Sequence, residues 1–426
     1  MISVDEALAE ILSHVQPLEG EQVPILDALG RILAEEIISD IDIPPFDNSA
    51  MDGYAVRSAD VARATPESPV CLTVVGSVAA GYVAGVRVEP GTAIRIMTGA
   101  PLPGGADAVV PIEETSDANQ PRGVRLATPS DEVQVRKAVQ AGDHVRPAGE
   151  DVRFGERVMA PGRLVRPQEI GVLASLGRET VLVHRRPRVA ILATGDELLK
   201  VHEPLAPGKI RSSNEYTNAA LVTRTGGIPI RLGIARDNVA DLTARIRSGL
   251  EQGVDLFLTS GGVSVGDYDV VKDVLGAEGE MQSSAMMLFW QVNMRPGKPL
   301  AFGLLPGGVP LIGLPGNPVS AMVSFEQFAR PAILKMLGQA DLTKPTVRAI
   351  LDEPLSNSGC RGFVRVVVTR RDGCYHARTT GEQGSGVLTS MAKANGLAIV
   401  PEGTYQVEIG SVAAVQMLDW PEGTGA

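Results

Sequence analysis

Aromatic residues are scarce in this sequence of 426 residues, and so are cysteines. Phe, Trp and Tyr together make up 4% of the chain, so we expect hydrophobic cores built from Val, Ile, Leu and Ala. The three cysteines, Cys71, Cys360 and Cys374, are an odd number without the spacing of a metal site. This pattern predicts neither a disulfide framework nor a zinc site, and it favours a reducing compartment.

Long apolar runs and an excess of positive charge are also missing. No stretch holds the roughly 18 consecutive apolar residues of a membrane span, and residues 1–6 lack the basic and apolar regions of a signal peptide. The formal net charge of −11, without a basic run, disfavours nucleic acid and anionic membrane surfaces as partners. We therefore expect a cytoplasmic protein without membrane insertion, in which any anionic ligand meets a local cationic pocket.

The first half of the chain predicts a helical region interrupted by a β-rich one. A chain of this length exceeds one hydrophobic core and predicts roughly three or four domains. Ser3 and Glu6 form a capping box before a helix, and residues 26–38 predict a second helix. From about residue 47 to 146, short Val-, Thr- and Ile-rich runs between Gly, Pro and Asp turns predict a β-rich insertion, before a helix at 168–176.

The second half predicts an α/β domain followed by an all-β domain. Between residues 188 and 337, strand patterns alternate with helical ones, which predicts βαβ units and a parallel sheet. Such sheets bind ligands at the carboxyl ends of their strands, where the loops 194–197 and 260–264 fall. After residue 344, short strands with Gly turns predict a small β domain.

The Gly-rich loop at 260–269 follows a predicted strand and precedes a predicted helix. Its glycines allow backbone N–H groups to approach a phosphate. The alternative is a tight turn with Asp267 or Asp269 as N-cap, and the residues leave both interpretations open. Carboxylates beside a phosphate would require a bridging Mg²⁺, because bare carboxylates repel the anion.

Three further loops carry carboxylates or hydroxyls: 194–198, 98–100 and 149–151. The first has two acidic residues at the predicted carboxyl edge of the sheet, where they suit a metal or complement a helix dipole. The other two add a hydroxyl and a carboxylate. Each of these two loops taken singly is better explained by a turn or a cap.

Two proline-containing turns suit an oxyanion. Asn317 and Pro318 fit the N-cap and first position of a helix at 321–337. The free N–H groups of that helix end, with the Ser320 hydroxyl, suit a tetrahedral anion. The turn at 295–299 supplies two cations between prolines, and a solvated surface turn is its alternative interpretation.

Residues 45–55, PFDNSAMDGYA, resemble the signature of the molybdopterin molybdenumtransferases, the family of MoeA and the gephyrin E domain. Similar motifs continue along nearly the whole chain, at 95–100, 104–110, 149–151, 194–198, 260–262, 295–303, 313–321 and 390–397.

The resemblance implies a multidomain α/β fold and an elongated homodimer. The α/β domain that binds molybdopterin has a parallel-rich sheet, and it is joined by a β-rich inserted domain, a helical and β hinge domain and a C-terminal β-barrel-like domain. The implied boundaries are 1–46 with 146–183 for the N-terminal hinge and dimerisation domain, 47–145 for the insertion, 184–338 for the α/β domain and 339–426 for the barrel.

The implied function is molybdenum cofactor biosynthesis. Molybdate would be inserted into adenylylated molybdopterin with Mg²⁺-dependent release of AMP, and a molybdopterin adenylyltransferase would act upstream. The matching motifs imply catalytic roles for Asp52, Thr98, Asp151, Glu197, Asp237 and Asp269, with Glu197, Asp237 and Asp269 also holding Mg²⁺. They imply substrate binding by Arg146, Asn214, Ser260, Gly261, Gly262, Ser264 and Lys272, and molybdate binding by Arg186, Pro187, Ser213, Lys298 and Ser320.

Two positions depart from the family pattern, and one other class of function is open. Ser212 stands where Asp is usual, which bears on pterin or nucleotide contacts, and Arg295 stands where Lys is common, which changes the donor geometry.

The alternative to an enzyme is a gephyrin-like scaffold that binds peptide segments of partner proteins, with or without transferase activity. The acidic residues favour the enzyme, because a pure scaffold need not keep them. A third possibility is a transferase for another phosphate ligand, which would bind ordinary nucleotides and would not bind molybdate.

Overall fold

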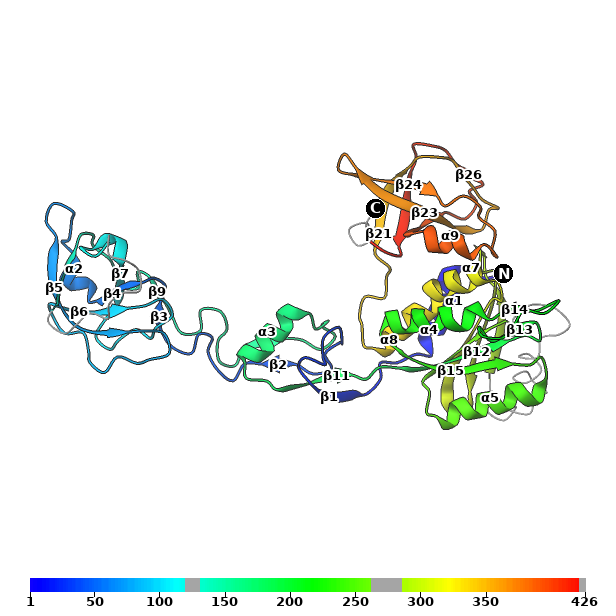
Figure 1. Ribbon diagram of the computed structural model, residues 1–426, viewed down its shortest axis with the longest axis horizontal. Coiled ribbons are helices and arrows are strands. Elements are labelled where there is room, and N and C mark those ends of the chain that lie inside the picture. Colours follow the sequence, from blue (N-terminus) through cyan, green and yellow to red (C-terminus); the bar gives the residue numbers. More distant parts are fainter. Residues whose placement is uncertain (119–130, 262–285, 421–426) are drawn as a thin grey trace. The chain divides into compact units, whose positions relative to one another are not determined.

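The computed structural model describes residues 1–118, 131–261 and 286–420 (Figure 1). The chain forms two compact units. Unit 1 comprises Met1–Ala34, Pro161–Pro167 and Thr180–Ala426, and unit 2 comprises Glu35–Ala160 and Gln168–Glu179. Among the described residues, none of the helices has the length and apolar composition needed to cross a membrane.

Unit 2 is β-rich, as the sequence predicts. Its five-stranded sheet has the order β7, β4, β6, β5, β8. These strands are β4 (Gly53–Val56), β5 (Val70–Val78), β6 (Thr92–Ile96), β7 (Ala108–Pro111) and β8 (Asp131–Val135). Smaller elements are β2 (Ile37–Ile38) with β10 (Arg157–Met159), β3 (Asn48–Ser49) with β9 (Val145–Arg146), α2 (Ser58–Val61), η1 (Ile112–Glu114) and most of α3 (Pro167–Ser175).

Unit 1 contains the predicted α/β domain. Its six-stranded sheet has the order β15, β12, β16, β20, β19, β17. The first four strands pair in parallel, whereas β19 pairs antiparallel with both β20 and β17. The strands are β12 (Arg188–Thr194), β15 (Ile228–Ala235), β16 (Leu256–Ser260), β17 (Met286–Gln291), β19 (Pro299–Leu305) and β20 (Val309–Leu314).

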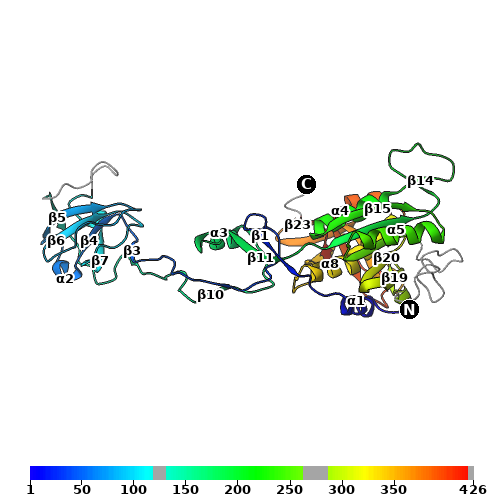
Figure 2. The same ribbon diagram turned by 90° about the horizontal axis from the view of Figure 1, so that it is seen from below.

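Helices cover both faces of this sheet. α1 (Val4–Ser13), α4 (Ser213–Thr225) and a helical run of α7 (Pro318–Ser324), η3 (Phe325–Ala329) and α8 (Arg330–Met336) pack on one face, and α5 (Val239–Glu251) packs on the other (Figure 1). Figure 2 shows α1 beside α8. Alternate strand residues enter the two cores, since Ile191 belongs to the first and Leu192 to the second.

The C-terminal part of unit 1 is a closed barrel of five strands. β21 (Thr346–Leu351), β24 (Cys374–Thr379), β23 (Arg361–Arg371), β25 (Gly396–Val400) and β27 (Val412–Met417) pair in that order, and β27 returns to β21. Accessory elements of unit 1 are β1 (Gly20–Pro24) with β11 (Thr180–His184), β13 (Leu198–Leu199) with β14 (Ile210–Arg211), β22 (Leu355–Ser356) with β26 (Gln406–Val407), β18 (Met294–Arg295), η2 (Pro306–Gly308) and α9 (Leu388–Lys393).

Of the two N-terminal elements predicted from local sequence, the first is confirmed and the second is wrong. The predicted capping box is present, because Glu6 N–H donates to the Ser3 hydroxyl at 3.1 Å and Ser3 N–H donates to the Glu6 carboxylate at 2.8 Å. The helix predicted at 26–38 is wrong. Leu33 N–H donates to the Arg163 carbonyl at 2.9 Å, so extended pairing with distant segments satisfies this backbone.

Helix α1 is also tied to the barrel by an ion pair, which predicts a pH effect. Arg361 donates to both Asp5 carboxylate oxygens, at 2.7 and 2.8 Å, and these hydrogen bonds lower the pKa of Asp5. A depressed folded-state pKa stabilises the fold above the unfolded-state pKa of about 3.9, and this contribution is lost as the pH falls through the folded-state pKa. Asp5→Asn should therefore cost up to about 1 kcal/mol near neutral pH and clearly less near pH 2. Urea midpoints at both pH values measure this, and an equal deficit at both would contradict it.

Candidate functional site

The functional loops of the α/β domain start from one edge of its sheet. β12, β15, β16 and β20 are parallel, and the register places Thr194 opposite Ala235, and Ser260 opposite both Ala193 and Leu314. The loops after these four strands therefore begin side by side. This confirms the prediction that the segments after residues 193 and 260 meet at the carboxyl edge.

Two acidic loops interlock at this edge. Asp196 N–H donates to the Asp237 carboxylate at 3.1 Å, and Asp237 N–H donates to the Asp196 carboxylate at 3.4 Å. Gly195 has φ +146°, which favours glycine, and a Cβ there would lie 2.4 Å from a Glu197 carboxylate oxygen, so a side chain would displace that carboxylate. The Asp196 carbonyl accepts from Lys209 Nζ at 2.6 Å. Glu197 and Asp237 thus sit on neighbouring loops that hold each other.

Exposed carboxylates on neighbouring loops suit Mg²⁺, which prefers oxygen ligands and keeps several waters. Within residues 1–118, 131–261 and 286–420, no three His, Cys, Asp or Glu side chains gather closely enough to hold a metal. Asp269, the third predicted ligand, lies outside the described residues. The described part of the chain therefore supplies two of the three predicted carboxylates.

Three of the predicted substrate-binding residues lie close together. Gly261 has φ +90°, its N–H donates to the Leu314 carbonyl at 3.2 Å, and a Cβ there would lie 2.6 Å from the Thr194 carbonyl oxygen. Asn214 donates to the Gly316 carbonyl at 2.8 Å, and Gly316 packs against Gly261. The Ser260 side chain is 3% exposed, and its hydroxyl has no partner within the described residues. Gly262, Ser264 and Lys272 lie outside the described residues.

Ser212, which departs from the family pattern, is also buried here. It occupies the N-cap position of α4 without forming a side-chain capping bond. The residue is 1% exposed, and its hydroxyl has no partner within the described part of the chain. A buried hydroxyl without a partner is costly, so a ligand group or water is expected to satisfy it.

Unit 2 holds the other predicted catalytic residues. The Asp52 carboxylate accepts from both the Thr98 N–H and the Thr98 hydroxyl, each at 2.8 Å, so two hydrogen bonds hold these residues together. Arg146 lies in β9, opposite Asn48 of β3, and Asp151 N–H donates to the Ile43 carbonyl at 2.9 Å. The side chains of Asp52, Thr98, Arg146 and Asp151 are exposed.

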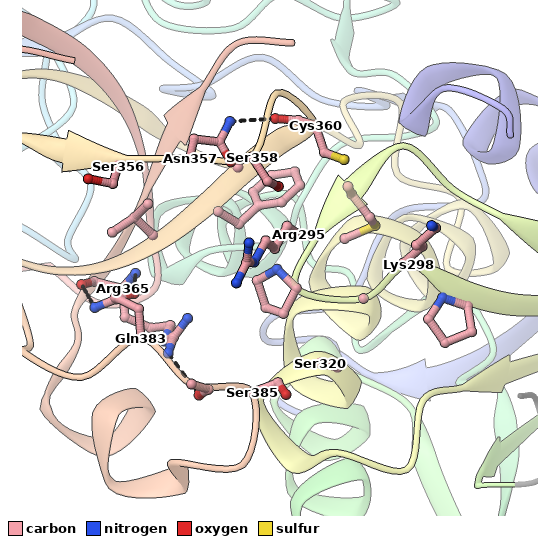
Figure 3. A pocket seen from close by; sticks show the side chains of 18 residues that line it. Arg295, Lys298, Ser320, Ser356, Asn357, Ser358, Cys360, Arg365, Gln383 and Ser385 are labelled. Carbon is pink, nitrogen blue, oxygen red and sulfur yellow. Dashed lines mark hydrogen bonds between the residues drawn. The ribbon is translucent and has the colours of Figure 1, made fainter. Parts of the chain in front are cut away.

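A pocket of about 610 Å³ lies between the α/β domain and the barrel (Figure 3). Three cationic side chains line it, Arg295, Lys298 and Arg365, and no Asp or Glu lines it among the residues that the structure describes. Hydroxyl and amide groups complete its polar surface, from Ser320, Ser356, Asn357, Ser358, Gln383 and Ser385. A water-accessible cavity with this charge balance favours an anion.

Arg365 is the most unusual of these cations, because it is 1% exposed. Its Nε donates to the Ser390 hydroxyl at 3.1 Å and its Nη2 to the Gly384 carbonyl at 3.0 Å. No carboxylate forms an ion pair with it in the part of the chain that the structure describes, and burial lowers the pKa of its guanidinium. A buried cation held only by neutral acceptors can offer its remaining donors to an anion.

Sequence reasoning missed Arg365, although a signal was present. The run Gly362-Phe363-Val364-Arg365-Val366 belongs to an apolar strand, and Phe363, Arg365 and Val366 are all buried. Arginine is rarely buried without a partner, so its position within an apolar strand marks a polar site.

The five predicted molybdate-binding residues do not share one cavity. Lys298 and Ser320 line the cationic pocket, whereas Arg186 lines a different pocket. Arg186 and Pro187 precede β12, at the amino edge of the sheet, about 20 Å from its carboxyl edge by the strand rise. Ser213 begins α4 and is not part of the cationic pocket. The structure therefore does not bring these five residues together within one chain, and the motifs carry no information on which edge of the sheet each residue occupies.

Comparisons with known proteins match this arrangement. The chain matches the MoeA N-terminal region (domain I and II) over residues 2–177, a probable molybdopterin binding domain over 190–335, and the MoeA C-terminal region (domain IV) over 348–418.

Similar proteins cover nearly the whole chain. Molybdopterin molybdenumtransferase 2 of Mycobacterium tuberculosis is 39% identical over 96% of this chain and 98% of its own length. Molybdopterin molybdenumtransferase of Bacillus subtilis is 37% identical over 99% and 96%, respectively. The crystal structure of the molybdopterin biosynthesis MoeA protein from Pyrococcus horikoshii OT3 has a TM-score of 0.81 at 30% identity, and covers 98% of this chain and 100% of that one. The chain therefore belongs to the molybdopterin molybdenumtransferase family.

Proposed function

We propose that this protein inserts molybdate into adenylylated molybdopterin and releases AMP, which yields molybdenum cofactor. The observation that carries the proposal is the cationic pocket, whose described lining includes Arg295, Lys298 and Arg365 and no carboxylate. Molybdate is a tetrahedral dianion, and charge-assisted hydrogen bonds from such donors are its natural partners. The family membership supplies the rest of the proposal, since relatives over the full length are molybdopterin molybdenumtransferases.

Within this proposal, the pocket binds molybdate and the carboxyl edge binds the nucleotide-bearing substrate. Lys298 and Arg365 donate to molybdate from opposite domains, and the Ser320 hydroxyl adds a neutral donor. Ser260, Gly261 and Asn214 form the wall for the adenylylated molybdopterin, and the buried hydroxyls of Ser260 and Ser212 find their partners on it.

Mg²⁺ would bind through Glu197, Asp237 and Asp269. The donor chemistry fits, because Glu197 and Asp237 are carboxylates on loops at the edge where phosphates bind in such sheets. When bound, the ion supplies positive charge that stabilises the charge developing on the phosphate as AMP leaves. Glu197 and Asp237 would hold the ion and accept hydrogen bonds from water at this edge.

The proposal includes a homodimer in the cytoplasm, with catalytic roles for Asp52, Thr98 and Asp151 and a substrate-binding role for Arg146. Exposed apolar side chains support a partner surface on unit 1: Leu26 is 74% exposed, Leu29 50% and Ile228 40%, and all three line one pocket with Arg186.

The free cysteines support the cytoplasmic location. Cys71, Cys360 and Cys374 are free thiols, which suits a reducing compartment.

The test is release of AMP from adenylylated molybdopterin by the purified protein with Mg²⁺, with and without molybdate. Release should require molybdate, and Asp237→Asn should slow it by about 100-fold or more, because a carboxylate that holds the metal is lost. The matched control is Asp372→Asn, in an exposed hairpin turn where asparagine also tolerates the left-handed backbone. Tight binding of the intermediate without AMP release would contradict the proposal.

The scaffold function is the second candidate. A scaffold predicts that the folded protein binds partner peptides and that the Asp237→Asn variant binds them equally well. Pull-down with the Asp237→Asn variant separates the two, and the comparisons favour the enzyme.

A further inference from the structure

The helical run that begins beside the cationic pocket contains a π-helical turn. The run extends through α7, η3 and α8, and the turn η3 (Phe325–Ala329) is π-helical, with Arg330 N–H donating to the Phe325 carbonyl. Ser320, near the start of the run, lines the pocket. A π turn inserts a residue into a helix and is rarely kept without a local reason. It therefore calls for a structural explanation.

The π turn presents two buried polar side chains to the barrel. Gln327, which is 8% exposed, forms a reciprocal amide pair with Gln416 of β27: Gln327 Nε2 donates at 2.8 Å and Gln416 Nε2 donates at 3.3 Å. Glu326 pairs with Lys344, which lies just before β21, at 2.5 Å, and both side chains are at most 8% exposed. Both contacts cross from the α/β domain to the barrel.

The barrel is attached at the pocket as well. Arg295 of β18 lies opposite Gly362 in a parallel pairing with β23, and Val319 N–H donates to the Ser385 carbonyl at 3.1 Å. Ser324, the residue before the π turn, has a buried hydroxyl that would lie 2.6 Å from a Cβ at Gly297. The same helix therefore touches the pocket at one end and clamps the barrel about two turns later.

We propose that the π turn is a positioning element, which holds the barrel so that Arg365 faces Lys298 and Ser320 across the pocket. The Gln327–Gln416 and Glu326–Lys344 contacts together are called the clamp. The inference rests on the proposed function, since it assigns the clamp a role in molybdate binding. The Asp5–Arg361 ion pair also attaches the barrel, and Phe363 of the barrel shares an apolar core with Phe325 of the helical run. Apolar packing is not directional, whereas the buried amide pair and ion pair are, so we expect them to set the rotation of the barrel about the pocket. Because hydrogen bonds to a small anion need donors placed within fractions of an ångström, a small rotation would weaken binding.

A double-mutant cycle on the amide pair tests the clamp with neutral side chains of similar length. Gln327→Met and Gln416→Met should each raise the KM and Kd for molybdate by roughly threefold to tenfold, the worth of a well-placed hydrogen bond. The double variant should be no worse than either single one, because both act through one contact. The kcat and the KM for adenylylated molybdopterin should stay unchanged. Gln252→Met, at the exposed end of α5, is the control.

A charge pair should rescue the contact. Gln327→Glu combined with Gln416→Lys keeps a directional contact between the same positions, and it should return the Kd for molybdate to within about twofold of the wild type. Molybdate binding is measured by calorimetry, which needs no turnover. If the wild type binds molybdate and the folded Gln327→Met and Gln416→Met variants bind it equally well, or their effects add, the clamp is overturned and the proposed function stands. If the wild type binds no molybdate, both are overturned.

Discussion

Replacing Arg365 by methionine should raise the KM for molybdate by about 10-fold to 100-fold, while the fold remains intact. The guanidinium is the one buried cation of the pocket lining, and its loss removes charge-assisted hydrogen bonds that each contribute about 1.5–3 kcal/mol. The KM for adenylylated molybdopterin should change little, because Ser260, Gly261 and Asn214 lie at a separate surface.

The fold should tolerate this change better than most losses of a buried charge. Burial without a carboxylate partner already makes the Arg365 guanidinium expensive to hold, as the lowered pKa shows. Methionine fills a similar volume without that cost, so the thermal midpoint should stay within a few degrees of the wild type. The Ser390 hydroxyl keeps its own bond to the Val387 carbonyl at 2.6 Å.

The matched control is Arg370→Met, on the same strand β23 but exposed to solvent. It removes the same charge from the protein without touching the pocket. Steady-state AMP release at several molybdate concentrations provides both KM values. An unchanged KM for molybdate in Arg365→Met would mean that the anion binds elsewhere. An equal rise of this KM in Arg370→Met would mean that the effect comes only from the lost net charge.

What the sequence predicts correctly about this protein depends on short-range rules. The capping box at Ser3 and Glu6 and the alternation from β12 to β16 follow from residue spacing within a few turns or strands. The meeting of the loops after Thr194 and Ser260 follows from a general property of parallel sheets. These rules need no knowledge of which distant segments pair.

The errors concern contacts between distant segments. Residues 31–34 have helical spacing, but they extend because partners at 163–165 and 182–184 accept and donate their hydrogen bonds. Arg186 and Lys298 look equally suited to an anion in sequence, and the sheet separates them to opposite edges. Arg365 joins the pocket only because the barrel packs against α7. Such pairings between distant segments cannot be inferred from local patterns.

Gly297→Ala should lower the affinity for molybdate by about 100-fold or more, although no charge changes. Gly297 lies between Arg295 and Lys298 in the pocket, and its φ of +106° is a conformation that L residues rarely adopt. A Cβ there would lie 2.6 Å from the Ser324 hydroxyl oxygen and 2.9 Å from the Met294 methyl carbon. Ser324 is fully buried on a helix, and we expect the turn to shift and carry both cations with it. Displacements of about 1 Å commonly cost 100-fold in a preorganised site.

The control for Gly297→Ala separates backbone strain from collision. Gly307, in the turn between β19 and β20, has φ +84° and nothing within 4 Å of a Cβ, so Gly307→Ala imposes comparable strain without displacing a cation. Both variants should lose stability, by about 1 kcal/mol or more from the unfavourable φ alone. Only Gly297→Ala should also lose molybdate binding in calorimetry. Equal binding by the two variants would mean that the position of the Arg295–Lys298 turn does not matter, and that the buried Arg365 side of the pocket alone holds the anion.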